Sequence, residues 1–139
     1  VPNDVTNEAR ALLLLDSLGL IEVDESKGLT ITKKDILSNP LELEIVELAA
    51  EIIPSKLAEL DVAVINGNVA LTSKVADKAI PNSGEKEDSL GAQTYANLIA
   101  VQKGNENAEA IKILIEALQQ ESVKQYINDT YSGLVVPIN

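Results

Sequence analysis

The chain has 139 residues, 45% of them hydrophobic, and three tyrosines are its only aromatic residues. That is enough apolar material for a buried core, which must be packed from aliphatic side chains. The net charge of -11 repels phosphate backbones and anionic lipids, so we expect no nucleic acid among its partners. Cysteine and histidine are absent, which excludes disulfides, Ser-His-Asp and Cys-His catalysis and typical zinc sites.

The sequence also lacks the patterns of a membrane span, a calcium loop and a phosphate-binding loop. This chain has no run of about 18 uncharged apolar residues, the length needed to span a membrane, and its first residues lack the pattern of a signal peptide. There is no initiator methionine either, so we expect the chain to be a processed or excised piece of a longer protein. The acidic residues lack the spacing of a calcium loop, and glycine-rich phosphate motifs are absent. We therefore expect no metal and no cofactor.

The chain begins with a predicted strand end and a helix. Residues 1–5 resemble the tail of a strand, which Pro2 interrupts. A helix is expected from about Thr6 to Leu18, with Thr6 as its N-cap. Gly19 follows directly and is typical of the residue just past a helix end.

The next stretch predicts strands around a short helix. Residues 20–23 are a short strand candidate, and a turn leads from them into an extended segment at 29–32. Thr32 and Asp35 have the spacing of a capping box. We expect it to begin a short helix at 33–38.

The middle of the chain alternates predicted strands and helices. Residues 41–49 alternate polar and apolar side chains, which is the pattern of a strand with one solvent-exposed face. Residues 53–60 predict a short helix, and the continuous apolar run at 61–66 predicts a buried parallel strand. A further helix is expected at 67–79. Turn formers and charges at 81–93 indicate an exposed loop.

The last third continues the alternation. Residues 94–102 predict a second buried strand, and helices are expected at 108–120 and 121–131, before a short extended tail at 134–139. The first of these helices has an apolar stripe at Ile111, Leu114, Ile115 and Leu118. We expect this stripe to pack in the core. Alternating strands and helices predict the α/β class with a mainly parallel sheet.

Three polar residues fall where open parallel sheets bind ligands, at the carboxyl ends of strands and beside helix N-termini. Arg10 is the only arginine in the chain. It follows the junction PNDVTNE, where exposed backbone N–H groups favour an anion and a planar guanidinium can grip a carboxylate. Asn66 ends the run DVAVIN, and Asn97 lies inside the apolar segment TYANLIAV.

Each of these residues also has a plainer interpretation. Asn66 precedes Gly67, and Asn-Gly is a common turn pair. A buried Asn97 could bond neighbouring backbone rather than a ligand. Arg10 could pair with Glu8 or with an acidic loop. Composition alone leaves these alternatives open.

Four segments occur together in the order and spacing of one known family. They are PNDVTNEARALLLL, DILSNPLELEIVELAA, AVIN at 63–66 and YANLIAV. In these segments the chain resembles the methionine-binding lipoprotein family, often called NlpA/MetQ, and the resemblance covers essentially all 139 residues. It implies a two-lobed, periplasmic-binding-protein-like fold. It also implies a solute-binding function, in which methionine or a methionine-containing dipeptide is captured and delivered to an ABC importer.

The resemblance also implies roles for individual residues. The arginine of the family's TNE-RALLLL motif holds the ligand carboxylate, and that position is Arg10 here. Two ligand-contacting asparagines of the family correspond to Asn66 and Asn97, and Asn7 is a further candidate contact. The family reads TNEGRA where this chain has Ala9, a small change that a helix should tolerate.

The family's mature chain has roughly a further lobe's worth of sequence before the PND motif. The resemblance therefore implies that residues 1–92 form one complete lobe, the second, and that residues 93–139 form the crossover and the C-terminal part of the first lobe. An incomplete lobe exposes sheet edge and apolar helix face, so self-association of this truncated chain is expected.

The absent part would carry the aromatic residues that clasp the methionine side chain and the lipidated cysteine. The full-length protein is thus expected to be extracytoplasmic and anchored to the cell membrane as a lipoprotein, with the permease of the importer as partner. An effector-binding domain of a regulatory protein is the alternative, because similar folds serve that purpose. An enzyme is not expected, since no pair of carboxylates is set apart from the solvated faces.

Overall fold

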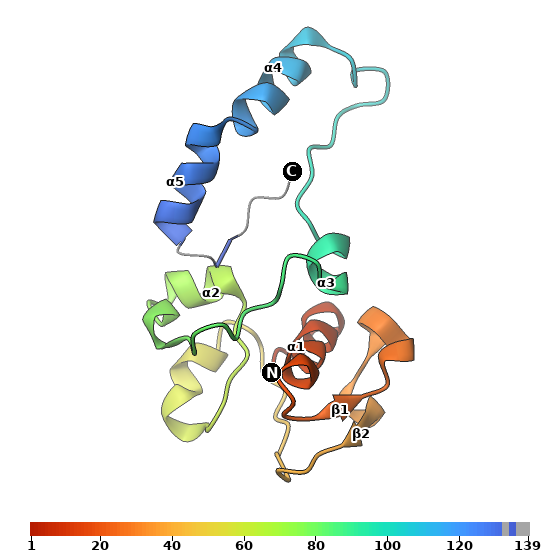
Figure 1. The fold of residues 1–139 in the computed structure, drawn as a ribbon, viewed down its shortest axis with the longest axis vertical. Coiled ribbons are helices and arrows are strands. Elements are labelled where there is room, and N and C mark those ends of the chain that lie inside the picture. Colours follow the sequence, from red (N-terminus) through yellow and green to blue (C-terminus); the bar gives the residue numbers. More distant parts are fainter. Residues whose placement is uncertain (132–133, 136–139) are drawn as a thin grey trace. The chain divides into compact units, whose positions relative to one another are not determined.

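The computed structural model describes residues 1–131 and 134–135 of the chain (Figure 1). It contains helices and short strands, and it divides into two compact units, Val1–Ala92 and Gln93–Asn139. The identification of these units with the lobes of a binding protein stays a prediction.

The first helix, α1, spans Val5–Ser17. Asp4 is its N-cap, because the Asp4 carboxylate accepts a hydrogen bond from the backbone N–H of Asn7 at 3.0 Å. The predicted N-cap Thr6 is wrong, since it lies inside the helix and Asp4 places a charged acceptor at the positive end of the helix dipole. Gly19 follows the helix with a φ of +71°, which confirms the predicted end.

One face of α1 forms the core of the first unit. Leu12 and Ile31 are both fully buried, at 0% exposure. Burying an aliphatic side chain of this size stabilises a fold by about 1.5–3 kcal/mol. The buried cluster comprises Ala9, Leu12, Leu15, Ile21, Val23 and Ile31. The aliphatic composition is therefore sufficient for a close-packed core around this helix.

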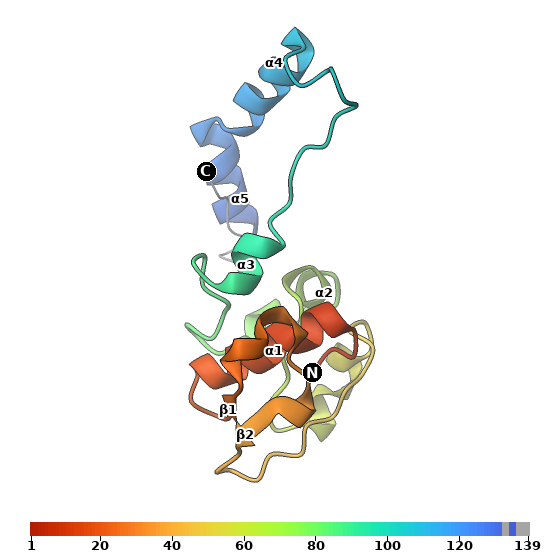
Figure 2. The ribbon, with the colours of Figure 1, turned by 90° about the vertical axis from the view of Figure 1, so that its right-hand side faces the viewer.

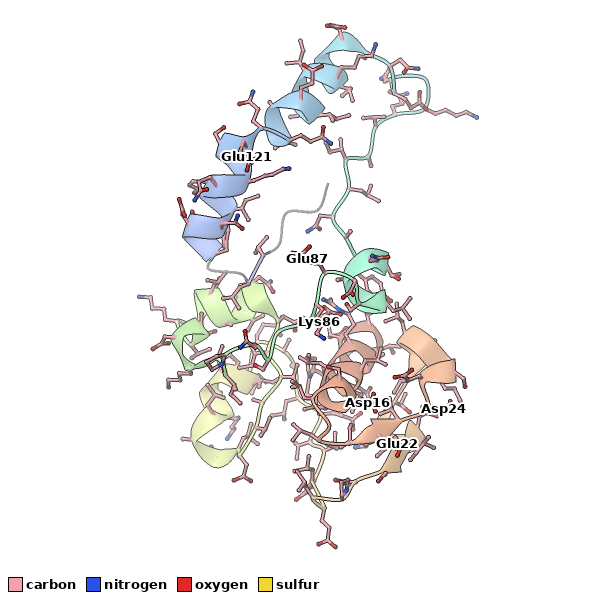
Figure 3. The ribbon with its side chains drawn as sticks, in the orientation of Figure 1. Asp16, Glu22, Asp24, Lys86, Glu87 and Glu121 are labelled. Atoms are coloured by element: carbon pink, nitrogen blue, oxygen red, sulfur yellow. The ribbon has the colours of Figure 1, made fainter. Side chains whose placement is uncertain are left out.

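The strands β1, Glu22–Val23, and β2, Ile36–Ser38, form a two-stranded antiparallel sheet. The paired residues are Glu22 with Ser38 and Val23 with Ile36. Asp16 ties β1 to the end of α1, because its carboxylate accepts a hydrogen bond from the Val23 backbone N–H at 3.0 Å. Asp16 and Glu22 are labelled in this part of the unit in Figure 3. The predicted strand at 20–23 is confirmed in its second half.

Two 3-10 helices, η1 at Glu25–Thr30 and η2 at Lys33–Asp35, lie between these strands. The extended segment expected at 29–32 is wrong in its first half, where η1 continues. The capping box of Thr32 is confirmed. The helix expected at 33–38 is wrong beyond its first turn, because its last three residues pair with β1 as a strand.

The mainly parallel sheet is wrong for the described residues. Their only parallel pairing is an isolated bridge between Pro2 and Leu48, so the strands expected at 1–5 and 41–49 are reduced to this bridge. The segment 61–66 forms no strand, and its residues are exposed or half-buried. A strand needs a neighbouring strand to complete its backbone hydrogen bonds. Within the described residues, no segment pairs with these stretches beyond the single bridge.

Three short helices follow in the first unit: η3 at Ile53–Glu59, α2 at Gly67–Thr72 and η4 at Ala76–Lys78. The helix expected at 53–60 is confirmed, although it is of the 3-10 type. The helix expected at 67–79 is interrupted, because Lys74 has a φ of +56° and cannot continue a right-handed helix.

The remaining helices are α3 at Leu90–Thr94, α4 at Glu109–Leu118 and α5 at Glu121–Tyr131 (Figures 1 and 2). The helices expected at 108–120 and 121–131 are confirmed. The expectation that the α4 stripe is core is wrong, since Leu114 and Leu118 are 43% and 50% exposed.

The buried strand expected at 94–102 is also wrong for this chain. The segment has no strand pairing among the described residues, and Leu98 is 81% exposed. An apolar run predicts that something buries it, but it does not identify the covering element. The tail expected at 134–139 falls mostly outside the described residues.

The capping box gives a prediction for acid stability. The backbone N–H and hydroxyl of Thr32 donate to Asp35 at 2.9 and 3.0 Å, and these bonds hold the pKa of the Asp35 carboxyl below its ordinary value. Their contribution is therefore present above the ordinary pKa of about 3.9 and is lost as the pH falls through the lowered pKa. Asp35→Ala should lower the melting temperature at pH 7, and the deficit should shrink toward about pH 3.

Circular dichroism melts between pH 7 and pH 3 check this prediction. Asp61→Ala, at an exposed position, is the control and should leave the melting temperature nearly unchanged at every pH. A deficit of Asp35→Ala that is equally large at both ends of the range would contradict the assignment.

Candidate functional site

The outer face of α1 carries the candidate site. The buried side chains Ala9, Leu12 and Leu15 fix the rotation of the helix about its axis. Because the helix turns about 100° per residue, Asn7 and Arg10 must lie on the opposite side, on a stripe three residues apart. The core therefore determines the direction in which these two polar side chains point.

Asn7 is the centre of a polar network on this face. Its Oδ1 accepts hydrogen bonds from Asn66 Nδ2 at 2.9 Å and from Arg10 Nη1 at 3.3 Å. Its Nδ2 donates to the carboxylate of the N-cap Asp4 at 3.0 and 3.1 Å. The structure thus brings together three of the four predicted contacts, Asn7, Arg10 and Asn66.

Asn66 has one amide atom without a partner. It lies directly before α2, and its Nδ2 is engaged by Asn7. Its Oδ1 is buried and accepts no hydrogen bond from the described residues. A buried carbonyl oxygen of this kind favours any donor that can reach it, because leaving it unsatisfied costs about 1–3 kcal/mol. The Asn-Gly turn interpretation does not account for this oxygen.

Asn97, the fourth predicted contact, lies in the second unit and is exposed. The expectation that it is a buried amide is wrong in this structure, because the segment around it forms no strand. Its participation in a site with the other three residues stays a prediction.

Arg10 pairs with a carboxylate from the segment expected to be an exposed acidic loop. Its Nη2 lies 2.5 Å from Glu85 Oε2, and its Nε lies 3.4 Å from Glu85 Oε1. Two nitrogens on one edge of the guanidinium therefore face the two oxygens of one carboxylate, the arrangement that arginine offers and lysine does not. Of the two ion-pair alternatives for Arg10, the acidic loop is the one realised.

Glu8, the other alternative, turns away from this face. It is 6% exposed, and its Oε1 accepts a hydrogen bond from the Lys33 backbone N–H at 3.1 Å. Burial raises the pKa of the Glu8 carboxyl above its ordinary value. Glu8 therefore links α1 to η2 rather than shaping the candidate site.

The Glu85 carboxylate lies between the Nε–Nη2 edge of Arg10 and Gly91, a place called here the Arg10 seat. A Cβ at Gly91 would overlap Glu85 Oε1 and would come within 2.9 Å of Arg10 Cγ. The seat opens into a pocket of about 300 Å³. Its apolar lining includes Leu13, Leu14 and Leu90.

Glu85 and Gly91 were not among the residues predicted from the sequence. The available signal was indirect, because the chain has one arginine and an acidic segment was recognised as its possible partner. Neither the particular carboxylate nor the need for a glycine could be read from that pattern. Within the described residues there is no group of side chains that could hold a metal ion and no helix able to cross a membrane.

Comparison with known proteins gives consistent matches. The NlpA lipoprotein family model matches residues 1–139. The D-methionine-binding lipoprotein MetQ of Escherichia coli O157:H7 is 35% identical over 133 residues, which cover 96% of this chain and 48% of that protein. The chain spans about half the length of the curated relatives that it matches.

Solved structures give the same result. A nutrient binding protein from Burkholderia cenocepacia bound to methionine matches with a TM-score of 0.76 and 38% identity, over 98% of this chain and 56% of that one. The substrate binding protein of a methionine transporter from Streptococcus pneumoniae matches with a TM-score of 0.73 and 36% identity, over 100% and 54%. These neighbours confirm the α/β, periplasmic-binding-protein-like fold, of which this chain is a part.

The contact at Gly91 can be tested by adding one methyl group. Gly91→Ala should displace the Arg10–Glu85 pair, because a Cβ there would overlap Glu85 Oε1, and it should lower the free energy of unfolding by about 1 kcal/mol at most, since both side chains are partly exposed and can shift. Gly84→Ala on the same segment should stay within about 0.5 kcal/mol of the unchanged protein, since a Cβ there meets nothing within 4 Å. Urea unfolding measures both. Equal stability of the two variants would show that the seat is loose.

Proposed function

Because the chain belongs to the NlpA lipoprotein family, we propose that it binds methionine, or a methionine-containing dipeptide, for delivery to an ABC importer. Members of this family are substrate-binding proteins and not enzymes. The named relatives bind methionine, and the chain matches them over almost its whole length. Nothing in the described residues favours the alternative, an effector domain of a regulator.

The observation that carries the proposal is the edge of the Arg10 guanidinium formed by Nε and Nη2, called here the Arg10 fork. In the first unit this fork already holds a carboxylate, that of Glu85, with two nitrogens against two oxygens. The α-carboxylate of an amino acid has the same shape and charge. Arg10 can therefore bind such a ligand without any change in its own chemistry.

Asn66 supplies the complementary group. Its Oδ1 is a buried acceptor that lacks a donor among the described residues, and the α-ammonium of an amino acid has three N–H donors. Asn7 bonds both Arg10 and Asn66, so it holds the carboxylate-binding and ammonium-binding groups in a fixed relation. We propose that Asn97 is a further contact to the same ligand.

The larger assembly follows from the family. We propose that Val1–Ala92 is the second lobe and that Gln93–Asn139 contributes the crossover and the C-terminal part of the first lobe. The full-length protein would be an extracytoplasmic lipoprotein anchored to the cell membrane, and the permease of the importer would be its partner. The exposed stripe of α4 gives this chain, on its own, a surface for self-association.

Arg10→Lys tests the proposal most simply. The protein extended upstream to the length of its relatives should bind L-methionine about 1–3 kcal/mol more weakly with this substitution, because lysine keeps the charge but loses the two-nitrogen edge. Calorimetric titration gives the affinity, and a melt of each protein controls for folding. Unchanged affinity would remove Arg10 from the site.

Asn97→Ala separates a ligand contact from a structural amide. In the same extended protein it should weaken L-methionine binding by about 1 kcal/mol or more and leave the melting temperature nearly unchanged. Asn107→Ala, at another exposed asparagine of the second unit, is the matched control and should change neither quantity. A lower melting temperature with unaltered affinity would assign Asn97 to the fold.

A further inference from the structure

The carboxylate that fills the Arg10 fork belongs to the protein itself. Glu85 and Arg10 are 75 residues apart in the chain, so the pair closes a long loop and depends on the fold of the first unit. Both side chains are only partly exposed, at 24% for Glu85 and 29% for Arg10. The pair is therefore accessible to a competing anion while being partly shielded from water.

Two neighbours hold the Glu85 carboxylate and the Arg10 guanidinium in place. Gly91 lies against Glu85 Oε1 so closely that a Cβ there would force the Glu85 side chain to shift. Arg10 is held from the other side by Asn7 at 3.3 Å. Glu85 uses two nitrogens on this edge of the guanidinium, so two carboxylates cannot use the edge at the same time.

We propose that Glu85 is an internal competitor, a carboxylate of the chain itself that occupies the Arg10 seat and that a ligand carboxylate must displace. The inference rests on the proposed function, in which Arg10 receives the carboxylate of the ligand. The segment around Glu85 has few apolar residues and contains exposed positions at Lys86 and Glu87 (Figure 3), so it can move away without uncovering a core.

Internal competition sets a threshold for binding. A tethered group acts on its partner at an effective concentration in the millimolar range, so a ligand that offers only a carboxylate competes poorly. An amino acid also brings donors for the buried Oδ1 of Asn66, and this second interaction offsets the loss of the internal pair. Glu85 thereby weakens every carboxylate ligand by the same factor, and only a ligand with a second interaction still binds at low concentration.

The single arginine makes the seat directly observable. The Nε–Hε group of Arg10 gives one arginine side-chain signal in the nitrogen-labelled chain. The probe is sodium acetate, with sodium chloride at the same concentration as the control for ionic strength. The variants are Glu85→Gln and Glu85→Ala. The matched control is Glu87→Gln, which makes the same charge change two residues away at an exposed position outside the pocket lining.

Both Glu85 variants should shift the ligand-free Arg10 signal and should lower the apparent dissociation constant for acetate about two- to fivefold, the range expected when a partly exposed ion pair is removed. Glu87→Gln should behave as the unchanged chain. The same acetate response in all four proteins, or weaker binding to the Glu85 variants, would overturn the inference. Weaker binding would mean that Glu85 belongs to the ligand site instead of competing with it.

L-methionine then separates this inference from the proposed function. In the extended protein, Glu85→Gln should bind L-methionine about two- to fivefold more tightly. Binding that Arg10→Lys weakens and that the Glu85 variants leave unchanged would overturn the inference alone. No binding of L-methionine by any of these proteins, with the acetate result as expected, would overturn the proposed function and leave the internal competitor established.

Discussion

The burial of one face of α1 is the constraint on which the candidate site depends. Ala9, Leu12 and Leu15 are held in an aliphatic core, so the helix cannot rotate and its opposite stripe must present Asn7 and Arg10. The cap by Asp4 then fixes Asn7, which bonds Arg10 and Asn66 in turn. The candidate site is thus positioned by apolar packing, with hydrogen bonds setting the final orientation of each group.

The confirmed predictions rest on signals that are local in the chain. Gly19 ends α1 because a left-handed residue is needed there, and the Thr32 capping box involves groups three residues apart. The amphipathic helix α4 was likewise recognisable from its 3.6-residue period. Such features depend on the backbone and on near neighbours, so the sequence is sufficient to predict them.

The predicted strands depended on distant partners and were mostly wrong. Residues 41–49 and 94–102 have strand-like patterns, but a pattern records only that a face prefers burial, whereas a strand also requires a neighbour for its backbone groups. The apolar stripe of α4 shows the same limit, since the helix predicted from its period is confirmed and the predicted burial of the stripe is wrong. For the site, the relation of Arg10 to Asn66 came from the family resemblance. The choice of Glu85 depended on a contact across 75 residues that no local rule predicts.

A crystal structure of the protein, extended to the length of its relatives and grown with L-methionine, would show directly whether Arg10 receives the ligand carboxylate. We expect the ligand carboxylate to lie on the edge of Arg10 that Glu85 occupies in this structure, the ligand ammonium to donate to Asn66 Oδ1, and Glu85 to have moved away. A methionine bound elsewhere, with the Arg10–Glu85 pair intact, would contradict this expectation.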